Sequence, residues 1–154
     1  PDIKRAIHAV ELSSPVPIHY DKPVGKANGY YHLEEKYIAI RLGMSDSQTF
    51  KTLIHEVSHS ILHSLDENKY NRKVQEIQAE SVAFIVCSKY KIDTSEYSFG
   101  YISGYSENKD AKELKSSLDT ITKCADEITR SIDKELGVKS LDQIVKRKES
   151  VMER

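Results

Sequence analysis

Residues 52–63 read TLIHEVSHSILH and combine three histidines and one glutamate with apolar residues at spacings of three and four. This periodicity is typical of an amphipathic helix. Ser45, followed three residues later by Gln48, provides a capping box at the start of the same pattern. The sequence therefore predicts a helix from about Asp46 to about Leu65 that carries the histidines along its length.

Two of the histidines and the glutamate have the spacing of the HExxH arrangement of zinc enzymes. Four residues advance a helix by about 6 Å and turn it about 40° beyond a full circle, so His55 and His59 lie on one face and reach a single ion. Glu56 lies about 100° around the helix from His55, so its carboxylate flanks the ion without binding it. In such sites two histidines hold Zn²⁺ and the glutamate accepts a proton from zinc-bound water. The alternative is an amphipathic helix whose histidines bind no metal.

A catalytic zinc site needs a third protein ligand, and the next predicted helix, residues 72–90, offers two carboxylates. Glu76 and Glu80 stand one turn apart on it, and the 17 residues from His59 to Glu76 allow this helix to return antiparallel. Glu76 is the favoured ligand because it lies nearer the connecting loop. Glu80 is then a support that accepts a hydrogen bond from a ligand histidine, or the alternative ligand. The competing interpretation is that both glutamates are exposed and paired with lysines.

Three further residues are candidates for contacts with a substrate or a tetrahedral oxyanion. His63 lies two turns, about 12 Å, from His55, which is too far for the same tetrahedral site, so a role at the helix end or in a pocket wall is favoured. Tyr97 and Tyr101 lie one turn apart in a predicted helix over residues 96–105. A phenol there can donate to an oxyanion, but an aromatic stripe packed in the core is the commoner arrangement.

The chain as a whole divides into a β-rich front, about residues 13–43, and a helical remainder, about residues 45–153. Three of the four prolines fall in residues 13–29, which predicts extended chain with an edge strand around Pro17 to Tyr20. Aromatic and β-branched residues then flank a charged turn near residues 34–36, as in a hairpin. Further helices are predicted over residues 111–136, ended by Gly137, and from Ser140 to the C-terminus.

These elements predict one α+β, predominantly helical domain spanning residues 1–154, with a small antiparallel sheet packed on the HExxH helix. The chain does not begin with methionine, and we expect it to be a domain of a longer protein. The apolar face of residues 111–136 suits either a coiled-coil seam or a core-facing helix, and the core is the commoner case. Cys87 and Cys124 have no metal-binding spacing, so buried free thiols in a reducing cytoplasm are expected.

Composition excludes several classes of protein. The formal net charge is −1, which provides no general field for nucleic acid, and no direct nucleic-acid binding is expected. No run of 18 apolar residues is present, so no ordinary membrane helix is predicted. The first ten residues lack the apolar core of a signal peptide.

The stretch GYYHLEEKYIAIRLGMSDSQTFKTLIHEVSH, residues 29–59, resembles the hairpin and active-site helix of the ImmA/IrrE superfamily of zinc metallopeptidases. The resemblance is closer to the metallopeptidase domain of ArdC- and LtrC-type antirestriction and mobile-element proteins. In that branch ExxAE follows HExxH on the next helix, here Glu76 to Glu80. The chain departs from the ExEAN pattern of the wider superfamily because Gln78 precedes Ala79. The similarity spans about residues 29–136.

The resemblance implies a zincin-like fold and a gluzincin-like site with His55, His59 and Glu76 as zinc ligands. Glu56 is then the catalytic base. It also implies an N-terminal module similar to a single-stranded-DNA-binding domain in the full-length protein. ImmA/IrrE relatives cleave DNA-bound repressors in the cytoplasm, so a protein substrate, a repressor or the protein itself, is expected.

Two functions follow from the sequence. The favoured one is a zinc metalloendopeptidase in which Glu56 activates zinc-bound water. The alternative is a non-catalytic, zinc-stabilised interaction module of an antirestriction or conjugative-element protein. A structural zinc site closes its fourth coordination position with protein, whereas a catalytic site leaves that position to water or substrate.

Overall fold

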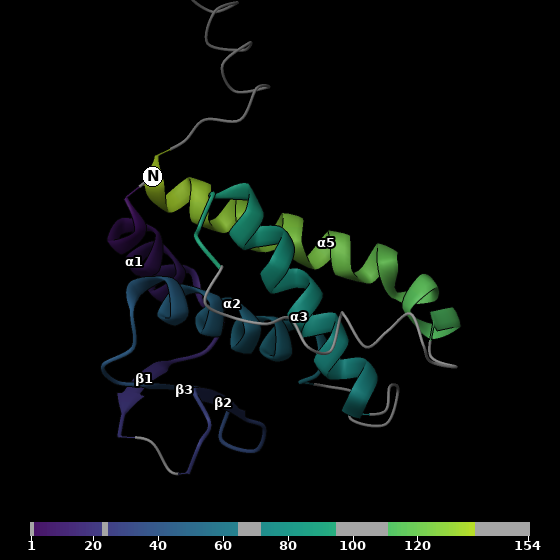
Figure 1. Ribbon diagram of the computed structural model, residues 1–154, viewed down its shortest axis with the longest axis horizontal. Coiled ribbons are helices and arrows are strands. Elements are labelled where there is room, and N and C mark those ends of the chain that lie inside the picture. The colour runs from purple at the N-terminus through teal and green to yellow at the C-terminus, as the bar shows by residue number, and fades with distance from the viewer. Residues whose placement is uncertain (1, 23–24, 65–71, 95–110, 138–154) are drawn as a thin grey trace, which may run out of the picture.

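The computed structural model describes residues 2–22, 25–64, 72–94 and 111–137. Figure 1 shows helix α2 between a small sheet and the remaining helices, an α+β and mostly helical fold as predicted. The elements are α1 (Ile3–Ser13), β1 (Ile18–Asp21), β2 (Gly29–His32), β3 (Tyr37–Arg41), α2 (Asp46–Leu62), α3 (Arg72–Lys89) and α5 (Ala111–Leu136). The helices predicted over residues 96–105 and from Ser140 onward lie outside the described residues.

The sheet is mixed, with the strand order β1-β3-β2. β2 and β3 form the predicted antiparallel hairpin, in which Tyr30 pairs with Ala39. β1 pairs with the other side of β3 in parallel, with Ile18 opposite Ile38, so the prediction of an antiparallel sheet is wrong for β1. Along the chain β2 comes between β1 and β3, although β3 lies between the other two in the sheet. β2 runs opposite to β3, and β3 runs in the same direction as β1. Sequence pattern locates strands but does not fix their pairing.

Helix α2 is positioned by contacts on several sides. The Ser45 hydroxyl caps it by accepting a hydrogen bond from the backbone N–H of Gln48, at 3.2 Å, as the capping pattern predicts. Its fully buried residues include Phe50 and Leu53, and it packs against α1, α3, α5, β2 and β3. The helix ends at Leu62, slightly before the predicted limit, with His63 as its C-cap.

Helix α1 is an element that the sequence analysis did not predict, since it assigned no structure before residue 13. The Asp2 side chain caps this helix by accepting from the N–H of Lys4. Its buried residues, Ala6, Ala9 and Val10, are small and pack against α2 and α5. Their burial comes from tertiary contact with helices that lie far away in the sequence.

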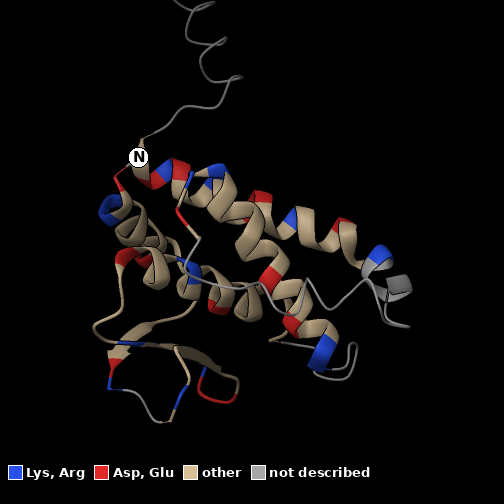
Figure 2. Cartoon of the chain, viewed as in Figure 1, with Lys and Arg blue, Asp and Glu red and all other residues tan. Residues whose placement is uncertain are grey.

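Helix α5 packs on α1 and α3, and its apolar face lies in the core. The buried residues of that face include Ile121, Ile128 and Ile132, so the core-facing interpretation is confirmed over the coiled-coil seam. Cys87 and Cys124 are free and buried, as predicted. Figure 2 shows basic and acidic residues interspersed along α5. None of the helices in the described ranges combines the length and apolar character needed to cross a membrane.

Candidate metal centre

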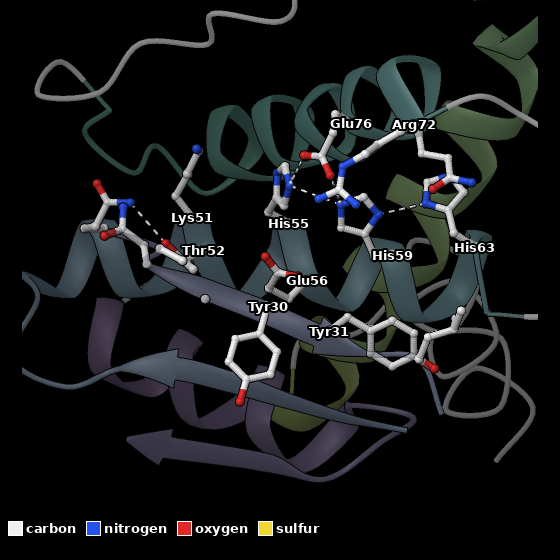
Figure 3. Close-up of a pocket in the computed structure, with 16 residues that line it drawn as sticks. Tyr30, Tyr31, Lys51, Thr52, His55, Glu56, His59, His63, Arg72 and Glu76 are labelled. Carbon is white, nitrogen blue, oxygen red and sulfur yellow. Dashed lines mark hydrogen bonds and ion pairs between the residues drawn. The ribbon is translucent and has the colours of Figure 1, made fainter. Parts of the chain in front are cut away.

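Three side chains from two helices converge at one point. His55 and His59 lie one turn apart on α2, and Glu76 reaches them from α3 (Figure 3). Each carboxylate oxygen of Glu76 lies 3.1 Å from one histidine Nε2, and the two Nε2 atoms lie 3.2 Å apart. The predicted ligand set is therefore brought together, with Glu76 rather than Glu80 as its carboxylate.

The geometry of this cluster fits a tetrahedral zinc ion. With ligand bonds of about 2.0–2.1 Å, the ligand atoms of a tetrahedral site are separated by about 3.3–3.4 Å. The separations of 3.1–3.2 Å among the three side chains approach that spacing. Two imidazoles and one carboxylate are also a donor set that catalytic zinc uses. His55, His59 and Glu76 could hold the ion without rearranging the helices.

The supporting role predicted for Glu80 stays a prediction. Glu80 lies buried on α3, 4% exposed, and is not part of the three-residue cluster. The Nδ1 atom of His59 contacts Nδ1 of His63 at 2.8 Å, while Nδ1 of His55 is buried with no hydrogen-bond partner in the described part of the chain. His63, the C-cap residue one turn further along α2, therefore contacts the ring of His59 directly.

Glu56 is 7% exposed and lines the same cavity as the three ligands. Figure 3 shows its carboxylate between His55 and strand β2. Burial raises the pKa of Glu56 to about 7; the negative charge of Glu76 acts in the same direction, and His59 and Lys51 oppose it. A pKa raised in this way suits the role predicted for Glu56.

His63 begins a chain of buried polar contacts that the sequence analysis did not find. Its Nε2 lies 2.7 Å from Oε1 of Gln78, and the Gln78 amide donates to Oγ of Ser117 on α5, also at 2.7 Å. Burial lowers the pKa of His63 to about 4, although the hydrogen bond to Gln78 opposes the shift. Gln78 and Ser117 are both fully buried. In the sequence, Gln78 and Ser117 are each visible as a polar residue at a core-facing position of a helix. That pattern does not reveal which residue each one contacts.

The cluster opens into a cavity of about 690 Å³ lined by α2, α3 and β2. Lys51 and Arg72 also line this cavity. The backbone of β2 approaches α2 closely at Gly29, where an added Cβ would lie 2.8 Å from Cγ2 of Thr52 and 2.9 Å from the carbonyl oxygen of Ala39. A glycine at this position therefore sets the distance between the strand and the helix.

Of the tyrosines considered for contacts with a substrate, those named in the sequence analysis and the one that lines the cavity are different residues. Tyr97 and Tyr101 lie outside the described residues. Tyr31 of β2, which the sequence analysis used only as a strand former, lines the cavity. Its hydroxyl is buried without a hydrogen-bond partner among the described residues, and burial raises its pKa.

Comparison with known proteins gives one distant relative to report. The chain is 29% identical over 129 residues to the uncharacterized protein pXO2-81 of Bacillus anthracis, an alignment that covers 75% of this chain. The chain spans only about a fifth of that protein's length, 21%. No family model matches the chain. No solved structure matches it either.

Proposed function

We propose that this chain is a zinc-dependent metallopeptidase domain that hydrolyses a peptide bond in a protein substrate. The observation that carries the proposal is the convergence of His55, His59 and Glu76 with the buried Glu56 in one cavity. Zinc ligands and an adjacent carboxylate of raised pKa are the two parts that metal-assisted hydrolysis requires.

The chemical roles divide between the ion and the side chains. A bound zinc ion supplies Lewis acidity, which polarises a carbonyl group and lowers the pKa of water. Glu56, with a pKa of about 7, accepts the proton of the attacking water and returns it to the leaving amine. Glu76 stays ionised: burial would raise its pKa, but its close contacts with His55 and His59 outweigh burial and hold the pKa well below its usual range.

The surroundings of the cluster support a peptide substrate. In the described part of the chain three donors converge, which leaves a fourth tetrahedral position for water or substrate. β2 is an edge strand of the described sheet and lines the cavity with Gly29 and Tyr30. An extended peptide can hydrogen-bond to such an edge and pass the cluster.

The resemblance to ImmA/IrrE-type and ArdC/LtrC-type metallopeptidases extends this proposal. It favours a DNA-binding repressor or the protein itself as substrate, and an N-terminal module similar to a single-stranded-DNA-binding domain elsewhere in the full-length protein. The two buried free thiols support a reducing compartment such as the cytoplasm.

One observation favours a second function, a zinc-stabilised interaction module without catalysis. The three ligands come from two helices, so an ion would hold α2 against α3 whether or not a substrate is cleaved. The test is to compare the wild-type protein with Glu56→Gln and His55→Ala, measuring zinc content and cleavage of a proteome-derived peptide library by mass spectrometry.

A peptidase predicts stoichiometric zinc in the wild type and in Glu56→Gln, with cleavage reduced at least about 100-fold in the variant. His55→Ala should lose both zinc and cleavage. Full zinc with no cleavage by the wild type would support the interaction module. Equal cleavage by wild type and Glu56→Gln would contradict the role of Glu56.

A further inference from the structure

A chain of hydrogen bonds leads from the metal ligand His59 across three helices. It runs from Nδ1 of His59 to Nδ1 of His63 (2.8 Å), from Nε2 of His63 to Oε1 of Gln78 (2.7 Å), and from the Gln78 amide nitrogen to Oγ of Ser117 (2.7 Å). Figure 3 shows its first link. His63, Gln78 and Ser117 are at most 5% exposed, so water does not compete for these bonds.

The directions of these hydrogen bonds are coupled. Because the Gln78 oxygen faces His63, the ring of His63 must carry its proton on Nε2 and donate it. The buried ring has only neutral partners, an amide and an imidazole, and is neutral, so its Nδ1 is an acceptor. His59 must then donate from Nδ1, which leaves a lone pair on its Nε2.

That lone pair faces the point at which the three proposed ligands converge. Nε2 of His59 lies 3.1 Å from a carboxylate oxygen of Glu76 and 3.2 Å from Nε2 of His55. At these distances the His59 lone pair and the Glu76 carboxylate repel each other unless a metal ion, or a proton on Nε2 of His55, lies between the three side chains. The chain of hydrogen bonds therefore selects the form of His59 that binds a metal.

We propose that His63, Gln78 and Ser117 are positioning residues that hold His59 in its Nδ1–H tautomer and fix its ring for zinc. The inference rests on the proposed zinc site but assigns roles to three residues outside the ligand set. His55 has no such support, since its Nδ1 lacks a partner among the described residues. His59 is thus the preorganised ligand of the pair, and Ser117 couples its orientation to α5.

If these hydrogen bonds only stabilise the fold, a different tautomer of His59 is possible. If the amide of Gln78 were reversed, it would donate to His63, His63 would donate to His59, and Nε2 of His59 would carry a proton. Such a network satisfies the buried groups equally well but blocks zinc binding. The tautomer of His59 therefore separates the two roles.

The first experiment measures that tautomer in the full chain by nitrogen NMR of labelled histidines, after treatment with a chelator, at about pH 8, where an ordinary histidine is neutral. The proposal predicts a protonated Nδ1 and a bare Nε2 on His59. His63→Phe should allow the other tautomer to appear, because the acceptor is removed. Ser60→Ala removes a buried hydroxyl of α2 that bonds only its own helix and is the matched control.

The second experiment measures the zinc dissociation constant by competition with a chromophoric chelator. Loss of a group that orients a ligand weakens metal binding about 10- to 100-fold, and we expect this for His63→Phe and Gln78→Leu. His63→Asn keeps an acceptor near the Nδ1 position and should restore most of the affinity. Ser117→Ala, at the far end, should have the smallest effect, and Ser60→Ala none. Circular dichroism checks folding, and if His63→Phe does not fold, His63→Asn and Ser117→Ala carry the comparison.

A protonated Nε2 on His59 in the wild type would overturn the proposal. So would zinc affinity within about twofold of wild type in every folded variant of His63, Gln78 and Ser117. Wild-type protein that binds no zinc would overturn both this inference and the metal site. If zinc affinity depends on His63, Gln78 and Ser117 but the protein cleaves no peptide, the inference stands and only the peptidase function is contradicted. The two proposals thus fail on different measurements.

Discussion

Two glutamates in one cavity differ because of what surrounds each carboxylate. Glu76 is buried but contacts His55 and His59, and these contacts outweigh its burial and keep it ionised. For Glu56 burial dominates, and its pKa rises to about 7. The opposite shifts of the two pKa values suit the two proposed roles, with Glu76 binding a cation and Glu56 transferring a proton.

The raised pKa of Glu56 predicts how stability depends on pH in chelator-treated protein. The folded-state pKa lies above the ordinary value of 4.5, so its contribution to stability is fully present below about pH 4.5 and lost as the pH rises to about 7. Glu56→Gln removes this cost, and the variant should be more stable than wild type by on the order of 3 kcal/mol at about pH 8. Urea unfolding at several pH values measures the difference. It should shrink toward zero near pH 4.5, and a difference independent of pH would contradict the assignment.

Because both cysteines are buried, the folded protein is expected not to react with thiol reagents. Burial raises the pKa of Cys87 and of Cys124 to about 12, so little reactive thiolate forms at about pH 8. A chromogenic disulfide reagent should react with neither thiol in the folded protein and with both after unfolding in guanidinium. Fast reaction of one thiol in the native state would show that its helix opens readily. Single Cys→Ala variants identify which thiol reacts.

At the scale of elements, the site depends on how α2 is held between α3 and β2. α2 presents His55 and His59 to α3, while Glu56 lies on the side of β2 (Figure 3). On the α3 side, Glu76 contacts both histidines. On the strand side the spacing is set by Gly29, which has no side chain where β2 meets Thr52.

Gly29→Ala is expected to push β2 away from α2, because the new methyl group would lie 2.8 Å from Cγ2 of Thr52 and 2.9 Å from the Ala39 carbonyl oxygen. Overpacking of this kind costs about 1–3 kcal/mol, which thermal or urea unfolding measures. Thr52→Ser removes the methyl group in the way but keeps the hydroxyl that accepts from Gln48. Adding it to Gly29→Ala should recover part of the loss, and a double-mutant cycle with purely additive effects would contradict this contact.

At the scale of the whole molecule, the sequence predicts features that depend on local spacing, such as helical periodicity. It does not predict contacts between segments that are distant along the chain. The periodicity of α2 and the spacing of His55 and His59 are local, and so is the distance along the chain to Glu76. The parallel pairing of β1, the burial of α1 and the contact between Gln78 and Ser117 join segments far apart in sequence. A buried polar residue in a core-facing position is visible in the sequence, but its partner is fixed only when three helices pack together.

Because the ligands come from α2 and α3, zinc should bind the folded molecule and not the unfolded chain, and it should therefore stabilise the whole domain. Free zinc at about 100 times its dissociation constant adds about 2.7 kcal/mol, which raises the melting temperature of a domain of this size by roughly 5–10 °C. Calorimetry with and without zinc, followed by a chelator, measures the shift and its reversal. Glu56→Gln should keep the shift because Glu56 does not bind the ion, whereas His55→Ala should lose it. An equal shift in His55→Ala would show that zinc binds elsewhere on the molecule.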